Sequence, residues 1–224
     1  MRMRNRSIAL LVVSLSLLLA SMAAGWAELS PLLGGDRTEA QTYELLAAGD
    51  LPKGLSLASR RLALFRCTDA MTSLRHLAQP RAVATEVSGV CANLAQVTLR
   101  DDPSNSLAWL LMSIVRADER DLQGFAADLQ RSQQTGPAEQ WLAGMRVELA
   151  ETHRDDIGDE ALAFMDGDLA LMAESSAGVA AIAQRYVNQP DFRERITRVV
   201  ETLSPEVQVR FLNWVTAAAA GQAR

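Results

Sequence analysis

The residues best suited to acid–base chemistry are two carboxylates that stand close together in the C-terminal third of the chain, Asp166 and Asp168. Two carboxylates can act as general acid and base when a cleft holds both against one substrate. Their surroundings predict a helix, on which residues two apart point about 200° away from each other. The pair is therefore not expected to share a substrate, and a divergent carboxylate-dependent hydrolase is only a remote alternative.

A second acidic cluster lies just before this pair and comprises Asp155, Asp156, Asp159 and Glu160. Clustered carboxylates can bind calcium, but the Asp-x-Asp-x-Asp-Gly spacing of a calcium loop is missing. Acidic side chains also stabilise the N-terminus of a helix. We therefore expect a solvated loop over 152–159 that leads into a helix, with no metal or cofactor bound.

Histidine chemistry has little support in this sequence. The chain contains two histidines, and for His76 no catalytic serine or cysteine partner is predicted other than the cysteine pair described next. An isolated histidine is more often a polar residue at a helix end than a proton shuttle. The sequence thus predicts no catalytic residue and a protein that is not an enzyme.

Cys67 and Cys91 are the only cysteines, and their spacing fits no zinc motif. Helices are predicted over 69–78 and 81–100. In an antiparallel hairpin that turns near Gln79, each cysteine lies twelve residues from the turn, so the two stand level, as a disulfide requires. In an oxidising compartment the pair is predicted to form a disulfide; the alternative is two buried thiols.

The N-terminal 27 residues have the pattern of an export segment. Three arginines among the first six residues precede an uncharged stretch over 7–27, whose apolar centre reads IALLVVSLSLLLA. This order is typical of a secretory signal, and the small residues around Ala23 and Ala27 suit cleavage. The stretch is also just long enough to span ~30 Å of hydrocarbon, with Trp26 at the interface. The sequence predicts a cleaved signal or an uncleaved anchor, and in both cases the rest of the chain crosses the membrane.

Composition favours a helical domain that does not bind nucleic acid. The chain has 224 residues, of which 49% are hydrophobic and only 5% aromatic. Alanine and leucine dominate, and both enter helices at little cost. Residues 28–224 contain 19 basic and 27 acidic residues, a formal charge of −8. Because such a domain repels phosphate backbones, nucleic acid is not an expected partner.

Periodic apolar residues and turn signals predict helices and no sheet. Leu107, Leu110, Leu111, Ile114 and Val115 form one apolar stripe, and Leu122, Phe125, Ala126 and Leu129 form the next. A further helix over 137–151 is expected to bury Trp141, Met145 and Leu149. A capping box is expected from Asp36 to Glu39, and an N-cap at Ser204. The remaining helices are predicted over 37–48, 53–66, 160–173, 176–188, 191–202 and 205–217.

One region resembles a known repeat. Pro103 and Pro137 are 34 residues apart, which is the period of the tetratricopeptide repeat. With Pro103 closing one unit, Trp109 falls at the family's tryptophan position and Met112 at its leucine position. Leu129 then falls at the late aromatic position, and Pro137 closes the unit. The departures are Arg116, where the family prefers tyrosine, and Phe125, where it has a small alanine, so this unit must splay its helices or pack on a shifted partner.

The resemblance implies a short α-solenoid that recognises proteins through a concave face. Residues 38–66 and 69–100 resemble degenerate units, so 37–151 is predicted to be tetratricopeptide-like, with 160–217 a C-terminal helical subdomain. The segments 28–36 and 218–224 are predicted to be a linker and a frayed tail. The stretch from DDPSNSLAWLL to TGPAEQWLAGMRVELAE is also similar to helical proteins encoded near envelope polysaccharide machinery in Gram-negative bacteria.

These features together predict a non-enzymatic scaffold or adaptor of the bacterial envelope, in the periplasm or in the inner membrane facing it. Its partners would be envelope proteins of unspecified identity, and the membrane as well if the N-terminal segment is kept. We expect the protein to serve surface polysaccharide assembly or export. A glycan-binding accessory factor is the alternative, and it would need exposed aromatic and arginine side chains on the concave face.

Overall fold

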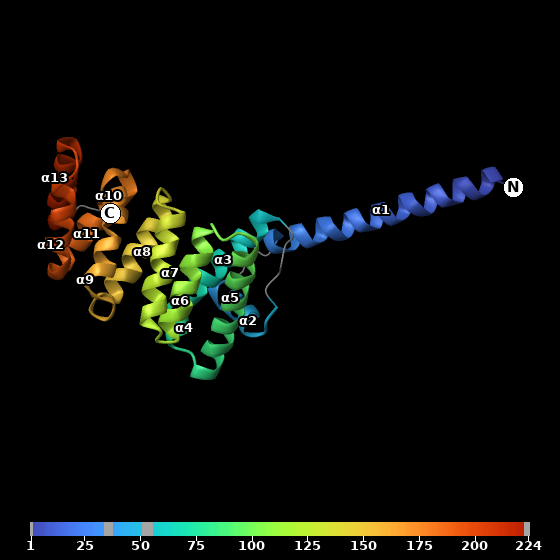
Figure 1. Ribbon diagram of the computed structural model, residues 1–224, viewed down its shortest axis with the longest axis horizontal. Helices are drawn as coiled ribbons and strands as arrows, with labels where there is room; N and C mark the ends of the chain where they lie inside the picture. The colour runs from blue at the N-terminus through green and yellow to red at the C-terminus, as the bar shows by residue number, and fades with distance from the viewer. Residues whose placement is uncertain (1, 34–37, 51–55, 222–224) are drawn as a thin grey trace. The chain divides into compact units, whose positions relative to one another are not determined.

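The computed structural model describes residues 2–33, 38–50 and 56–221 (Figure 1). Within these ranges the chain is all-helical, as predicted, and contains no strand. The helices are α1 (Arg2–Leu33), α2 (Glu39–Ala47), α3 (Leu57–Thr72), α4 (Leu74–Leu77), α5 (Arg81–Asp101), α6 (Ser106–Asp118), α7 (Leu122–Thr135), α8 (Gln140–Thr152), α9 (Arg154–Phe164), α10 (Asp166–Glu174), α11 (Ser176–Asn188), α12 (Pro190–Glu201) and α13 (Pro205–Ala219).

The chain divides into two compact units, unit 1 (Met1–Leu94) and unit 2 (Ala95–Arg224). This division differs from the predicted one, which separated 37–151 from 160–217. In unit 2, α8 contacts both α9 and α10, so the C-terminal helices pack directly on the predicted repeat helices. The predicted loop over 152–159 is mostly helical, because α9 begins at Arg154 and its helical geometry is interrupted only at Gly158, where φ is 77°.

Several helix boundaries in unit 1 differ from the prediction. α1 continues to Leu33 through most of the predicted linker 28–36, with Pro31 inside its last turn. The predicted cap Asp36 lies outside the described residues. The capping box is formed instead by Thr38 and Gln41, with the Gln41 N–H donating to Thr38 Oγ1 over 3.3 Å. Two helices were expected over 53–66 and 69–78; the structure has α3 and α4 there, but the break between them lies at Ser73 and not at 67–68.

The apolar stripes of α6 and α7 are buried largely as predicted, but the stripe of α8 is not. Leu110, Leu111 and Phe125 are fully buried. On α8, by contrast, Trp141 is 37% exposed, whereas Arg146 is completely buried. The buried face of α8 consists of Leu142, Ala143, Arg146, Val147, Ala150 and Glu151. Ala143 and Val147 on this face belong to the same apolar core as Leu169 and Met172 of α10.

Side chains of α8 and of α10 to α13 form a continuous apolar core in unit 2. Leu169, Ile182, Phe192 and Ile196 are each at most 1% exposed within it. Pro205 occupies the first turn of α13, as predicted, but the Ser204 hydroxyl makes no capping bond to the helix backbone. α13 extends to Ala219, two residues into the predicted frayed tail 218–224, and residues 222–224 lie outside the described part.

Candidate functional site

From Arg2 onward, the predicted export segment forms the first part of α1. The window Val12–Leu29 has a mean hydropathy of 1.6, and none of it is buried. In the described part of the chain, α1 is the one helix long and apolar enough to cross a membrane by length and composition. Trp26 is 68% exposed near the end of this window.

Glu28 joins the end of this window to the folded part of unit 1. Its carboxylate accepts a 2.6 Å hydrogen bond from the Ser56 backbone N–H and a 2.8 Å bond from the Ser59 hydroxyl. Ser56 is the N-cap of α3. An anion at a helix N-terminus is stabilised by the unpaired N–H groups there and by the helix dipole. Glu28 therefore attaches α3 to α1 directly after the uncharged stretch.

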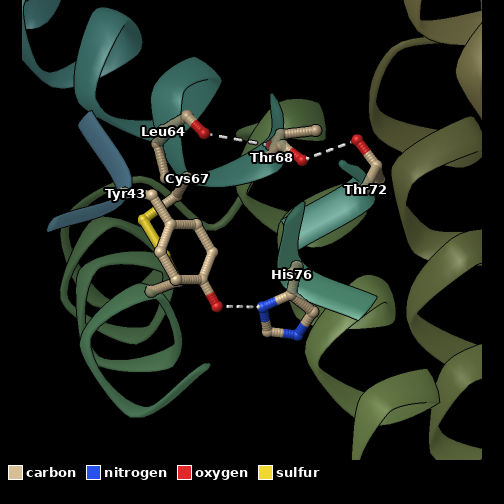
Figure 2. Close-up of a disulfide and its surroundings, with 7 residues drawn as sticks. Tyr43, Leu64, Cys67, Thr68, Thr72 and His76 are labelled. Carbon is tan, nitrogen blue, oxygen red and sulfur yellow. Dashed lines mark hydrogen bonds between the residues drawn. A yellow bond between two sulfur atoms is a disulfide. The ribbon is translucent and has the colours of Figure 1, made fainter. Parts of the chain in front are cut away.

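The predicted disulfide between Cys67 and Cys91 is present in unit 1 (Figure 2). It joins α3 to α5 with a Cα–Cα distance of 5.6 Å, and both residues are completely buried. The predicted level placement of the two cysteines on neighbouring helices is confirmed. A buried disulfide of this kind is typical of proteins that fold in an oxidising compartment.

His76 lies in the last turn of the short helix α4, at a helix end as predicted, and its side chain is buried in the core of unit 1. The Tyr43 hydroxyl and His76 Nδ1 are 2.8 Å apart and share a hydrogen bond (Figure 2). Both side chains are buried, at 3% and 4% exposed. This hydrogen bond joins α2 to α4 beside the disulfide. In the structure, His76 therefore holds these two helices together. Sequence reasoning missed the pair because 33 residues separate its members.

The residues matched to the tetratricopeptide pattern gather around the α6–α7 hairpin of unit 2. Met112 and Leu129 are buried, at 6% and 1% exposed, while Pro103 and Pro137 are exposed. The Trp109 indole N–H donates to the Pro103 carbonyl over 2.8 Å. The Arg131 guanidinium lies 4.7 Å from the centre of the indole ring. Trp109 thus closes the turn before α6, and protein groups already contact both its N–H and its ring.

The two residues at which this region departs from the repeat pattern have other partners. Phe125 is fully buried, and its ring centre lies 4.9 Å from that of His153, at the junction of α8 and α9. Arg116 forms ion pairs at the α6–α7 turn, including one of 3.2 Å with Asp121. A shifted packing partner for Phe125 is therefore found beyond the hairpin itself.

An ion pair at the centre of unit 2 is the most deeply buried charged group described. Arg146 and Asp168 both have completely buried side chains. Arg146 Nε and Nη2 donate to the two Asp168 oxygens, each over 2.7 Å. Nη2 also donates to the Gly136 carbonyl over 3.2 Å. The pair links α8, α10 and the turn after α7, and this bidentate geometry is the strongest form of arginine–carboxylate bond.

Arg195 forms a second buried charge cluster around the predicted acidic pair. The Arg195 side chain is only 6% exposed. Its Nε donates to Asp166 over 2.8 Å, and its other nitrogens bind Glu151 and the Leu162 carbonyl. Asp166 and Asp168 therefore face two different arginines and do not converge on one space. Their visible role is to hold helices together.

The acidic residues 155, 156, 159 and 160 are exposed on α9. Among them, Asp156 lies with a carboxylate oxygen 3.6 Å from His153 Nδ1. In the described ranges no group of three histidine, cysteine, aspartate or glutamate side chains is placed to hold a metal ion. The cluster lies in the first two turns of α9, where negative charge stabilises a helix.

Asp128 on α7 is a buried carboxylate held between two arginines. It is 5% exposed, and Arg131 Nη1 and Arg116 Nε lie 3.4 and 3.7 Å from its oxygens. Burial raises the pKa of Asp128 above its ordinary value of 3.8, while the two arginines offset part of this rise. The folded state therefore binds a proton on Asp128 more readily than the unfolded state does.

This raised pKa predicts a pH-dependent cost at Asp128. As pH rises from 3.8 through the raised pKa, Asp128 in the folded protein loses its proton, and burial makes the resulting charged form costly. The free energy of unfolding therefore falls over this interval. The melting temperature of the wild type relative to Asp128→Asn should therefore decrease over this interval. Thermal melts of both proteins at stepped pH measure the difference, with Asp159→Asn controlling for the loss of one negative charge. A relative stability that increases with pH would contradict the prediction.

Comparison of the chain with protein-family models, with curated proteins and with solved structures finds no match in any of the three. Function must therefore be inferred from the chain itself.

Proposed function

We propose that the protein is a membrane-anchored scaffold of the bacterial envelope, whose helical units face the periplasm and bind other envelope proteins. The observation that carries this proposal is α1, an exposed apolar helix joined to the folded part of unit 1 through Glu28. Three arginines precede the span, and such residues stay on the cytoplasmic side. The disulfide on the far side suits an oxidising compartment.

The continuity of α1 favours an anchor that is kept. The helix runs without a break through both candidate cleavage positions, Ala23 and Ala27, and ends at Leu33. A protease must bind an opened, extended segment, so a helical site has to unfold locally before it is cut. Glu28 adds two hydrogen bonds immediately after Ala27, and these oppose such opening.

The charged groups in unit 2 favour a scaffold over an enzyme. Arg146, Asp168 and Arg195 are buried and bound to protein partners. A general acid or base must instead reach a substrate within a cleft. The tetratricopeptide-like α6–α7 hairpin supports protein recognition, and Trp141 on the outer side of α8 offers an aromatic contact for a partner. Surface polysaccharide assembly or export is the pathway that we propose for these partners.

Affinity capture from crosslinked membranes tests both parts of the proposal. The tagged full-length protein is crosslinked in cells of its own species, and mass spectrometry is applied to the bait and to the captured proteins. We expect the bait to carry the peptides of residues 1–27 and to enrich proteins of polysaccharide synthesis or export. Trp141→Ala should reduce that enrichment, whereas Leu212→Ala, at another exposed apolar residue, should not.

The membrane anchor and the scaffold function can each fail separately in this experiment. A bait that starts at Ala24 or Glu28 identifies a cleaved signal and removes the anchor. An intact bait that captures no specific protein removes the scaffold, and binding of purified surface polysaccharide would then favour the glycan-binding alternative.

A further inference from the structure

The exposed face of α3 carries a pattern suited to a membrane surface. Leu57 is 76% exposed and Phe65 is 46% exposed, and Arg61 lies between them on the outside of the helix. Positions 57, 61 and 65 are four residues apart and so form one stripe along α3. Leucine and phenylalanine beside arginine on one helix face are typical of helices that lie in the lipid interface.

The bond from Glu28 brings the start of this stripe to the end of the proposed membrane span. The window Val12–Leu29 is about 27 Å long at a rise of 1.5 Å per residue, close to the thickness of the hydrocarbon core. Glu28 lies at its end, and Ser56, which it binds, immediately precedes Leu57. If α1 spans the bilayer, the first turn of α3 is therefore held at headgroup depth.

The distribution of charge favours lipid over an acidic or basic protein at this face. Residues 56–68 contain three arginines and no acidic residue. Residues 28–94 as a whole contain seven basic and seven acidic residues, whereas 95–224 contain twelve basic and twenty acidic ones. An anionic membrane surface thus repels the second segment but not the first, and it attracts the start of α3.

We propose that the Leu57–Arg61–Phe65 face of α3 is a second membrane contact, in which the apolar side chains enter the lipid interface and Arg61 binds the phosphate of an anionic phospholipid. This inference rests on the proposed anchoring by α1. The contact would hold unit 1 against the bilayer in a fixed orientation, where α1 alone would leave it free to swivel.

Site-specific fluorescence on the full-length protein tests this contact. Because both native cysteines are buried in a disulfide, a single new cysteine can be labelled selectively. An environment-sensitive dye is placed on Trp26→Cys, Leu57→Cys or Leu77→Cys, and each protein is reconstituted into vesicles of phosphatidylethanolamine and phosphatidylglycerol that carry a headgroup-depth quencher. Leu77 is the matched control, since it is a leucine of unit 1 that is 77% exposed and lies beyond the opposite end of α3.

We expect the dye at positions 26 and 57 to be blue-shifted and quenched, and the dye at position 77 to stay in water. Arg61→Ala should shift the equilibrium between the bound and free states of α3 about fivefold toward the free state, the effect of one basic side chain near an anionic surface. Glu28→Ala should reduce quenching at position 57 and leave position 26 unchanged.

The outcomes separate this inference from the anchor. If position 26 is not quenched, α1 does not insert and the anchoring proposal fails. If position 26 is quenched and position 57 is not, the anchor stands and the α3 contact is overturned. Equal quenching at positions 57 and 77 shows general adsorption of the protein to vesicles, which also overturns the contact.

Discussion

Asp168→Ala is expected to lower the free energy of unfolding by about 3–5 kcal/mol, the usual cost of removing one partner of a buried ion pair. The substitution leaves the Arg146 guanidinium in the core of unit 2 with only neutral partners, among them the Gly136 carbonyl. Denaturant titration of the detergent-solubilised full-length protein measures the change. Tryptophan fluorescence is a suitable signal, because three of the four tryptophans lie in unit 2.

Two further variants show whether the charge itself is responsible. Asp159→Ala removes an exposed carboxylate and should change the stability by less than about 0.5 kcal/mol. The double variant Arg146→Met with Asp168→Leu removes both charges and should recover much of the loss, since apolar replacement of a buried pair is often neutral. An Asp168→Ala protein as stable as the wild type would show that the pair does not hold α8 to α10.

Loss of the disulfide is expected to destabilise unit 1 by about 3.5 kcal/mol, from the loop-closure entropy for a separation of 24 residues. Because the bond is completely buried, the reduced form is best prepared as Cys67→Ala with Cys91→Ala, or by refolding in a reductant. Hydrogen exchange of the slowest amides in α3 and in the first half of α5 should then be roughly 300-fold faster.

The amides of α13 provide the internal control for this measurement, because they belong to unit 2 and should keep their protection. Unchanged protection in α3, in protein whose thiols are shown to be free, would mean that packing and not the disulfide sets the stability of unit 1.

The sequence correctly predicted those features of the structure that depend on a local pattern of residues. The apolar stripe of α6 predicted its buried face, and equal spacing from a turn predicted the pairing of Cys67 with Cys91. Both inferences use residues whose separation along the chain directly sets their separation in space. The all-helical class likewise follows from composition and periodicity.

The sequence did not predict the burial of polar groups whose partners are distant along the chain. An arginine such as Arg146 is expected at the surface, because its partner Asp168 lies 22 residues later in the chain. One local signal was present: Arg146 follows Leu142 by four residues and precedes Ala150 by four, so it interrupts an apolar face. His76 gave no such signal, because its partner Tyr43 belongs to another helix.

The cysteine content also determines how this protein can mature. Two cysteines allow one intramolecular pairing, so the oxidised chain has no wrong internal isomer to be corrected. Both belong to unit 1 and precede all of unit 2, so in the proposed export they cross the membrane ahead of the last 130 residues and can be oxidised first. Under the export that we propose, biogenesis would need a thiol oxidant in the receiving compartment but no disulfide isomerase.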